Sequence, residues 1–301
     1  RDRAKRVGIN TLVIDIKSFL TRPSIDLARH HALLTTASAE ASPWLTQLVE
    51  NLHKEGFRVS GRIVVFKEDH LVLARPDLGV RNLTTGGTWT DRKGGRWADP
   101  YSAEVQHYNF LISLAAAKSG IDEIQFDYIR FPTDGSMNTI RYAHADKRSH
   151  VKVIMDFLRK VRTGVEPYRT ALALDIFGVT AWQSKVDILH LGQDLRELSH
   201  YLDVVSPMLY PSHFHSGYDG FANPGSHPYY FMNMGVVKSQ EILAGLPVKV
   251  VPWIQGFNLR SPNYGSHYIR EQIRAINDAG SNDYLIWNAR NVYDAAVSGV
   301  R

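Results

Sequence analysis

Cysteine is absent from the 301-residue sequence. Its absence excludes disulfide bonds, cysteine nucleophiles and thiolate metal sites, and it leaves the redox compartment undefined. The sequence also lacks an apolar run long enough to cross a bilayer and lacks the pattern of a signal peptide. We therefore expect no membrane span, and either a cytosolic protein or a mature domain whose targeting segment lies outside this sequence.

Motifs of cofactor and nucleophile chemistry are missing as well. There is no phosphate-binding glycine loop, no dinucleotide fingerprint and no Ser/His/Asp order, so we expect no cofactor. His213 and His215 have the spacing of a chelating pair. A loop of aromatic and histidine side chains more often covers a ligand, however, and we expect no metal. The net charge of +5 is scattered among acidic residues, which argues against a nucleic acid partner.

Seven apolar runs rich in β-branched residues predict β-strands. Several are almost continuously hydrophobic, which is typical of parallel strands covered on both faces. The runs are Thr11–Lys17, Arg58–Phe66, Glu123–Phe131, Thr170–Phe177, Asp203–Tyr210, Val248–Gly256 and Asp283–Asn288.

Helix patterns lie between these runs, with capping residues, prolines and glycines at their ends. The expected helices run from Ser42-Pro43 to Gly56, Asp99-Pro100 to Gly120, Asp146 to Thr163 and His267 to Ala279. Such alternation without a break in composition predicts an α/β fold, a (β/α)8 TIM-type barrel formed by residues 1–301 as a single domain. Because a barrel has eight strands and Arg1–Gly8 reads as the end of a helix, we expect the first strand upstream of residue 1.

Three predicted strands carry an acid near the C-terminal end: Asp15, Asp127 and Asp175. An apolar strand has little reason to hold an acid unless the acid reacts or is paired. Barrel enzymes place their chemistry at these strand ends, so we predict that the three acids are catalytic. The long segments Ala74–Asp99 and Tyr210–Met234 are predicted to form binding loops at the same mouth.

Paired carboxylates suit cleavage of a glycosidic bond, in which one is protonated and the other attacks or activates water. The apolar neighbours Ile176 and Phe177 would favour the protonated form of Asp175, which fits the acid. A nearby cation, expected to be Arg130, would keep Asp127 ionised. Asp15 is expected to support the pair.

Aromatic and polar side chains on loops or strand ends are expected to bind the sugar, because apolar sugar faces pack on flat rings. Core packing is the alternative for Trp253 and Trp287, and turn or cap roles are the alternatives for Gln255 and Asn288. The predicted substrate-binding residues are Lys17, Arg130, Trp89, Trp97, Tyr210, His213, Trp253, Gln255, Trp287 and Asn288.

Several segments resemble a family of glycoside hydrolase barrels, from near residue 7 to the last strand. They are Val13–Lys17, Gly61–Lys67, Trp89–Tyr101 and, most specifically, Asp122-Glu-Ile-Gln-Phe-Asp-Tyr-Ile-Arg-Phe-Pro132. The resemblance implies a TIM-type barrel that acts on a polysaccharide or glycoconjugate, with Asp127 in the active site at the end of the fourth barrel strand. Chitinase-type barrels are similar here, but their catalytic glutamate position corresponds to Ile129, so their substrate-assisted chemistry is not carried over.

The predicted function is therefore a glycoside hydrolase with a carbohydrate substrate. Two alternatives stay open: a non-catalytic carbohydrate-binding barrel, and a lyase or aldolase that forms a Schiff base at Lys17. The resemblance favours an extracellular or cell-envelope location over a cytoplasmic one.

Overall fold

The computed structural model describes residues 1–24 and 39–300. Its chain divides into two compact units, which are described separately. The N-terminal unit comprises residues 11–174 and 185–202, and the C-terminal unit comprises residues 1–10, 175–184 and 203–301.

A parallel sheet forms the centre of the N-terminal unit. Its strands are β1 (Thr11–Asp15), β2 (Arg58–Val64), β4 (Glu123–Asp127) and the first four residues of β6 (Ala171–Phe177), in that order. In this register Asp15 lies opposite Arg62, and Val64 lies opposite Asp127. Because the strands are parallel, their carboxyl ends lie at one edge of the sheet, and that edge carries Asp15 and Asp127.

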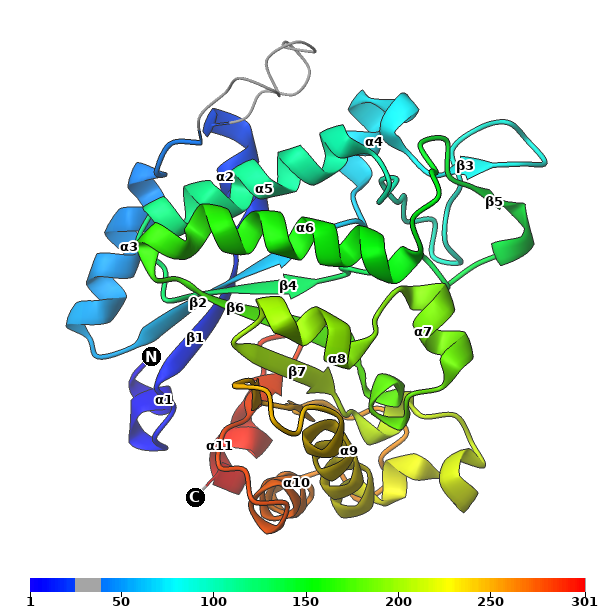
Figure 1. Ribbon diagram of the computed structural model, residues 1–301. Helices are drawn as coiled ribbons and strands as arrows, with labels where there is room; N and C mark the ends of the chain where they lie inside the picture. Colours follow the sequence, from blue (N-terminus) through cyan, green and yellow to red (C-terminus); the bar gives the residue numbers. More distant parts are fainter. Residues whose placement is uncertain (25–38, 301) are drawn as a thin grey trace. The chain divides into compact units, whose positions relative to one another are not determined.

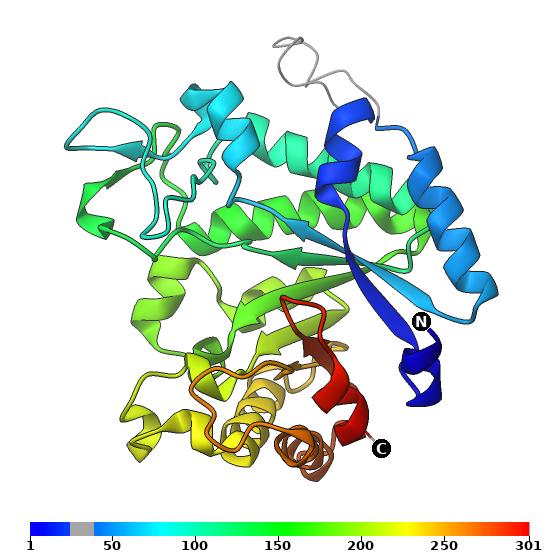
Figure 2. The same cartoon turned by 180° about the vertical axis from the view of Figure 1, so that it is seen from behind.

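Helices α5 (Ala103–Lys118) and α6 (His150–Val165) lie side by side and cover one face of these strands, as the two opposite views show (Figures 1 and 2). The buried rings of Phe66 and Phe126 pack against Phe157 of α6, with centroid distances of 6.1 and 5.7 Å. Further helices of this unit are α2 (Lys17–Ser24), α3 (Pro43–Lys54), α4 (Asp69–Ala74), α7 (Lys185–Leu191), α8 (Leu195–Leu198) and the short η1 (Pro76–Leu78), η2 (Met137–Thr139), η3 (Glu166–Tyr168) and η5 (Ser199–Tyr201).

Two helices begin later than predicted because a serine, not an aspartate, is the cap. Ser102 Oγ accepts the Val105 N–H at the start of α5. The Asp99 carboxylate instead accepts the N–H groups of Tyr101 and His144, both at 3.0 Å. Likewise α6 begins after Ser149, and not at Asp146. Each aspartate therefore stabilises the loop before its helix.

The predicted loop Ala74–Asp99 is folded. Its strand β3 (Arg81–Asn82) pairs antiparallel with β5 (Ile140–Arg141), which follows β4 in the chain. Isolated bridges such as Thr90 to Arg96 close the rest of the segment into a hairpin-like layer. This layer lies after the C-terminal end of β2.

The C-terminal unit contains a second parallel group of strands. Strand β7 (Val204–Met208) pairs with β8 (Lys249–Val250) and β9 (Trp253–Gln255), and β9 pairs with β10 (Leu285–Trp287). The predicted strand Val248–Gly256 is divided into β8 and β9 at Pro252, which has no N–H to donate to a neighbouring strand.

Helix α10 (Ser266–Asp278) packs against both α9 (Pro228–Ile242) and α11 (Asp294–Val300). The predicted loop Tyr210–Met234 is wrong at its end, because α9 begins at Pro228. The unit also holds α1 (Asp2–Arg6), η4 (Gly178–Trp182), η6 (Pro211–His213), η7 (Tyr218–Gly220) and η8 (Pro224–Ser226).

Every predicted strand run contains a parallel strand, and helices alternate with these strands, so the α/β barrel class is confirmed. The predicted helix near the N-terminus is also confirmed as α1, whose Arg3 forms an ion pair with Asp294 at 2.5 Å. The single-domain organisation and the upstream first strand stay predictions. Among the described helices, none has the length and apolar character needed to span a membrane.

Candidate active site

One guanidinium links two of the three predicted acids. Arg62, on β2, donates from Nη1 to Asp15 Oδ1 and from Nη2 to Asp127 Oδ2, both at 2.5 Å. Its Nε also lies 3.2 Å from Asp127 Oδ2. The side chain of Asp15 is 66% exposed, whereas that of Asp127 is 10% exposed. The buried carboxylate is therefore compensated by a fixed cation that a second, exposed acid holds in place.

The second oxygen of Asp127 is also engaged. Oδ1 accepts the backbone N–H of Tyr128 at 2.6 Å. Tyr128 has a φ of +51°, in the left-handed region that bulky side chains rarely adopt. Such backbone conformations cost about 1–3 kcal/mol and cluster at functional sites. The turn after β4 thus fixes the orientation of Asp127 at the expense of local strain.

Arg130 does not have the predicted role beside Asp127. Its Nη2 pairs with Asp134 at 2.7 Å, and its guanidinium lies over the rings of Trp97 and Tyr128 at 4.9 and 5.4 Å from their centroids. The cation that contacts Asp127 is Arg62. The prediction that Arg130 supplies this charge is therefore wrong. The chain turns at Tyr128, and the Arg130 side chain pairs with Asp134.

Lys67 is a second cation next to Tyr128. Its ammonium is 5.3 Å from the Tyr128 ring centroid and 2.7 Å from Asp91 Oδ2. Burial alone lowers the pKa of Lys67, but the hydrogen bond with Asp91 and the nearby Tyr128 and Asp134 raise it above 10.5. Lys67 therefore stays protonated and contributes a second positive charge next to the turn after β4.

Lys17 is a buried structural residue in this fold. Its ammonium donates to Val64 O at 2.6 Å and Asn109 Oδ1 at 3.0 Å, and it pairs with Glu68 Oε2 at 2.7 Å. Burial lowers the pKa of Lys17 more than Glu68 raises it. Its three N–H donors are all used, so the predicted sugar contact is replaced by a link between β2, α5 and Glu68. The partner of Asp15 is Arg62 and not Lys17.

Trp89 and Trp97 are core residues of the Ala74–Asp99 layer. Their side chains are 1% and 0% exposed. Trp89 Nε1 donates to Ser136 O at 3.2 Å, and Trp97 Nε1 donates to Asp91 Oδ2 at 3.3 Å. The flanking glycines and charges suggested exposed rings, but these neighbours form the turns of the layer while the indoles fill its interior. The prediction that both rings bind a ligand is corrected accordingly.

The third predicted acid, Asp175, lies in the C-terminal unit and is buried. Its Oδ1 accepts the indole N–H of Trp253 at 2.6 Å. Trp253 is buried too, and its ring meets the half-buried ring of Trp287 edge to face at 5.9 Å. Asp175 therefore accepts a hydrogen bond from a buried indole, which in turn packs against the half-buried Trp287.

Gln255 and Asn288 have structural roles. Gln255 Oε1 accepts the Ser212 N–H at 3.1 Å, and its Nε2 donates to Phe257 O and Ser261 Oγ at 3.0 and 2.9 Å. Asn288 Nδ2 donates to Gly256 O at 2.6 Å, and Asn288 Oδ1 accepts the Arg290 N–H at 2.9 Å. Both side chains fix loops after β9 and β10, which was the alternative left open for them.

Three rings gather after β7 and β9. The ring of Tyr210 meets those of His213 and Phe257 at 5.1 and 5.4 Å, and His213 is 5.9 Å from Phe257. Tyr210 is buried, Phe257 is partly exposed and His213 is exposed. This arrangement gives the C-terminal unit a small aromatic surface at the carboxyl ends of its strands.

Sequence reasoning missed Arg62 and Phe257. Arg62 is a charged residue inside an apolar strand, which is the same signal that identified Asp127. Applied to β2, that signal would have found it. Phe257 has no comparable signal, because it follows a strand in a loop and a single phenylalanine there is usual.

Comparison with known proteins places the chain in a family. The family model described as "Putative glycosyl hydrolase domain" matches residues 2–293, so the chain belongs to this family. No curated protein matches the chain in sequence.

Three solved structures have the same fold at low identity. The PgaB (BpsB) glycoside hydrolase domain from Bordetella bronchiseptica is 16% identical with a TM-score of 0.59, over 84% of this chain and 78% of that chain. The beta-galactosidase from the psychrophilic Marinomonas ef1 is 13% identical with a TM-score of 0.59, over 99% and 53%. The chitinase from Chromobacterium violaceum is 12% identical with a TM-score of 0.53, over 99% and 93%. At these identities the likeness establishes the fold.

Proposed function

We propose that this protein hydrolyses glycosidic bonds of a polysaccharide or glycoconjugate, with Asp127 and Asp175 as its two working carboxylates. The observation that carries the proposal is the buried Asp127 at the end of β4, held by Arg62 next to the strained backbone of Tyr128. A buried, oriented and charge-compensated carboxylate on a strained turn is typical of catalytic sites. Membership in a glycosyl hydrolase family supports the reaction class.

The two acids have environments that suit different roles. Asp127 receives a cationic and a backbone donor, which favour a carboxylate that attacks the anomeric carbon or activates water. Asp175 is buried and accepts the indole N–H of Trp253 on Oδ1, and burial favours the neutral carboxyl group that protonates the leaving oxygen. Asp15 acts through Arg62, as a positioning residue.

Aromatic side chains are proposed to hold the sugar. Trp287 is half-buried and meets Trp253 edge to face, and Tyr210, His213 and Phe257 form a second aromatic surface. Flat rings bind the apolar faces of sugars while their edges meet hydroxyl groups. Trp287, Tyr210 and His213 belong to the sugar-binding set predicted from the sequence, and Phe257 is a further candidate.

The test is a panel of bacterial and fungal polysaccharides, with reducing ends and product masses as readouts. The native protein is expected to release oligosaccharides from at least one polymer, and Asp127→Asn is expected to reduce the rate by at least about a hundredfold. Asp134→Asn is a matched control, because Asp134 is a half-exposed acid of the same connection that pairs with Arg130. Equal rates for the two variants would remove Asp127 from the mechanism.

A non-catalytic carbohydrate-binding barrel is the second candidate. One observation favours it: both oxygens of Asp127 already accept hydrogen bonds in the folded chain. In that case a glycan would bind to the native protein and to Asp127→Ala with equal affinity, and neither would release reducing ends.

We also propose an extracellular or cell-envelope location, since a polymeric glycan is encountered there. Fractionation of the source cells, followed by detection of the protein, tests this location. Recovery in the cytoplasmic fraction alone would contradict it.

A further inference from the structure

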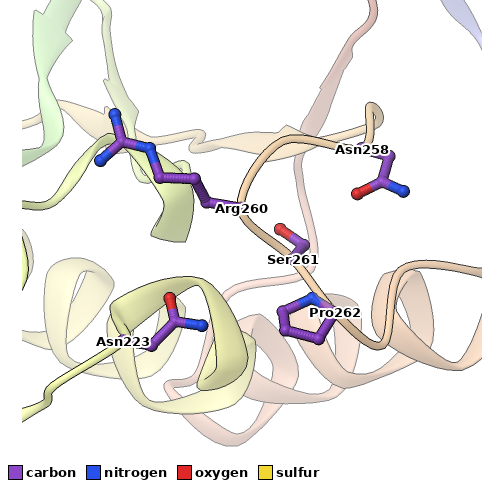
Figure 3. A pocket seen from close by; sticks show the side chains of 5 residues that line it. All are labelled: Asn223, Asn258, Arg260, Ser261 and Pro262. Carbon is purple, nitrogen blue, oxygen red and sulfur yellow. The ribbon is translucent and has the colours of Figure 1, made fainter.

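An open hollow of about 540 Å³ lies in the C-terminal unit, beside the loop that follows β9 (Figure 3). Arg260 and Asn258 project from this loop, and Asn223 projects from the facing turn before η8. The residues that line the hollow are Asn223, Asn258, Arg260, Ser261 and Pro262. None of these described lining residues is acidic, so the Arg260 guanidinium is the only formal charge among them.

The guanidinium of Arg260 is available to a ligand. The side chain is exposed, and within residues 1–24 and 39–300 no carboxylate pairs with it. Arg62 and Arg130 differ in this respect, since each forms an ion pair at 2.7 Å or less. The amide of Asn258 is likewise exposed and has no hydrogen-bond partner among the described residues.

The backbone that carries Arg260 is held in a left-handed conformation, with φ at +47°. Its carbonyl oxygen lies against Gly225, where an added Cβ would be 2.0 Å away. The same contact is secured by Tyr268, whose hydroxyl donates to Gly225 O at 3.0 Å and lies 3.3 Å from Ser261 Oγ. The loop therefore presents Arg260 from a fixed position, although glycine would adopt this φ with less strain.

We propose that this hollow is a subsite for an oxyanion on the glycan, either a uronic acid carboxylate or a phosphate, with Arg260 as the principal ligand. Guanidinium binds both groups through paired hydrogen bonds, and the amide of Asn258 offers further donors. Asn223 Nδ2 already donates to Ser226 Oγ at 2.8 Å. The fixed backbone of the loop holds the Cα of Arg260 at the edge of the hollow, so only the side chain has to be ordered when a ligand binds.

This inference names the substrate class of the proposed hydrolase and rests on that function. Its test is nevertheless a binding measurement, so a protein without hydrolase activity would still give a result. Binding is measured by calorimetry on the full chain carrying Asp127→Asn, which prevents cleavage of the probes. The probes are oligogalacturonate, a glycerol phosphate oligomer and a neutral oligogalactose of equal length.

The protein with native Arg260 is expected to bind at least one anionic probe. Which probe binds shows whether the subsite takes a carboxylate or a phosphate. Arg260→Ala is expected to weaken that binding about tenfold or more and to leave the neutral probe unchanged. Arg270→Ala, which removes an exposed arginine from α10 of the same unit, is the matched control and is expected to have no effect. Arg260→Gly keeps the left-handed backbone and is expected to lose binding without a lower melting temperature.

The inference is overturned if neither anionic probe binds. It is also overturned if Arg260→Ala and Arg270→Ala weaken binding equally, because the charge would then act non-specifically. If the Ala variant unfolds, the Gly variant decides the question alone, and unchanged affinity in it contradicts the subsite.

Discussion

Arg62 Nη2 lies 2.5 Å from Asp127 Oδ2, and this contact is the main restraint on the acid at the end of β4. Arg62→Met would leave the buried carboxylate without its cation. We expect the free energy of unfolding to fall by about 2–4 kcal/mol and the turnover to fall by about a hundredfold. Urea denaturation and reducing-end release measure the two effects.

The matched control for Arg62 lies on the same strand. Arg58 is exposed at the start of β2, and Arg58→Met is expected to change stability by less than about 0.5 kcal/mol and to leave turnover unchanged. If Arg62→Met behaves like the control, the ion pair does not support Asp127 in solution.

We expect substitution of Trp287 to impair binding of the glycan and substitution of Trp89 to impair stability. Trp287 is half-buried, so Trp287→Ala is expected to raise KM for the glycan about tenfold with a small loss of stability. Trp89 is 1% exposed, so Trp89→Ala is expected to lower the free energy of unfolding by about 3–5 kcal/mol. Steady-state kinetics and thermal melting distinguish them. A ligand-affinity defect in a stably folded Trp89→Ala protein would contradict its assignment to the core.

Lys17 and Glu68 form a buried pair at 2.7 Å. Lys17→Met would remove the cation that pairs with the buried Glu68, and we expect the free energy of unfolding to fall by about 3–5 kcal/mol. The double variant Lys17→Met, Glu68→Met is expected to recover part of that loss. Borohydride with carbonyl substrates is expected to trap no adduct at Lys17, because its ammonium is fully engaged. A trapped adduct would revive the Schiff-base alternative.

His150 makes stability depend on pH. Its ring stacks on Phe131 at 3.6 Å, and burial lowers its pKa below 6.5, which outweighs the hydrogen bonds to His190 and Leu189. The unfolded chain therefore takes up a proton near pH 6.5, whereas the folded chain does not. The free energy of unfolding is expected to fall as the pH drops from 6.5 through the folded-state pKa. In His150→Phe this part of the decline is expected to disappear, as urea midpoints at several pH values would show; an unchanged decline contradicts the assignment.

The strands, and the positions of the three acids on them, could be predicted from the sequence because both depend on local pattern. An apolar run flanked by turn residues forms a strand wherever it lies, and an acid inside it stands out, as Asp127 does. The partners of these acids could not be predicted in the same way. Asp15 and Asp127 meet at Arg62, which is 47 and 65 residues away in the chain, and register alone decides that contact.

Burial of the aromatic residues was the least predictable feature. Trp89 and Trp97 lie among glycines and charged residues, which suggested exposure. The antiparallel pairing of β3 with β5 forms a layer that encloses both indoles, and this pairing joins segments 58 residues or more apart. Trp287, inside an apolar strand, is more exposed than either.

The most direct test of the central claim compares leaving groups, using glycosides of the sugar that the polysaccharide panel identifies. Asp175→Asn is expected to cleave the natural linkage at least about a hundredfold more slowly than the native protein. On a dinitrophenyl glycoside it is expected to keep a near-native rate, because the dinitrophenolate group leaves without protonation. Asp127→Asn is expected to lose activity on both. If Asp175→Asn is equally impaired on both substrates, or if Asp127→Asn cleaves either at the native rate, the assignment of the two carboxylates is wrong.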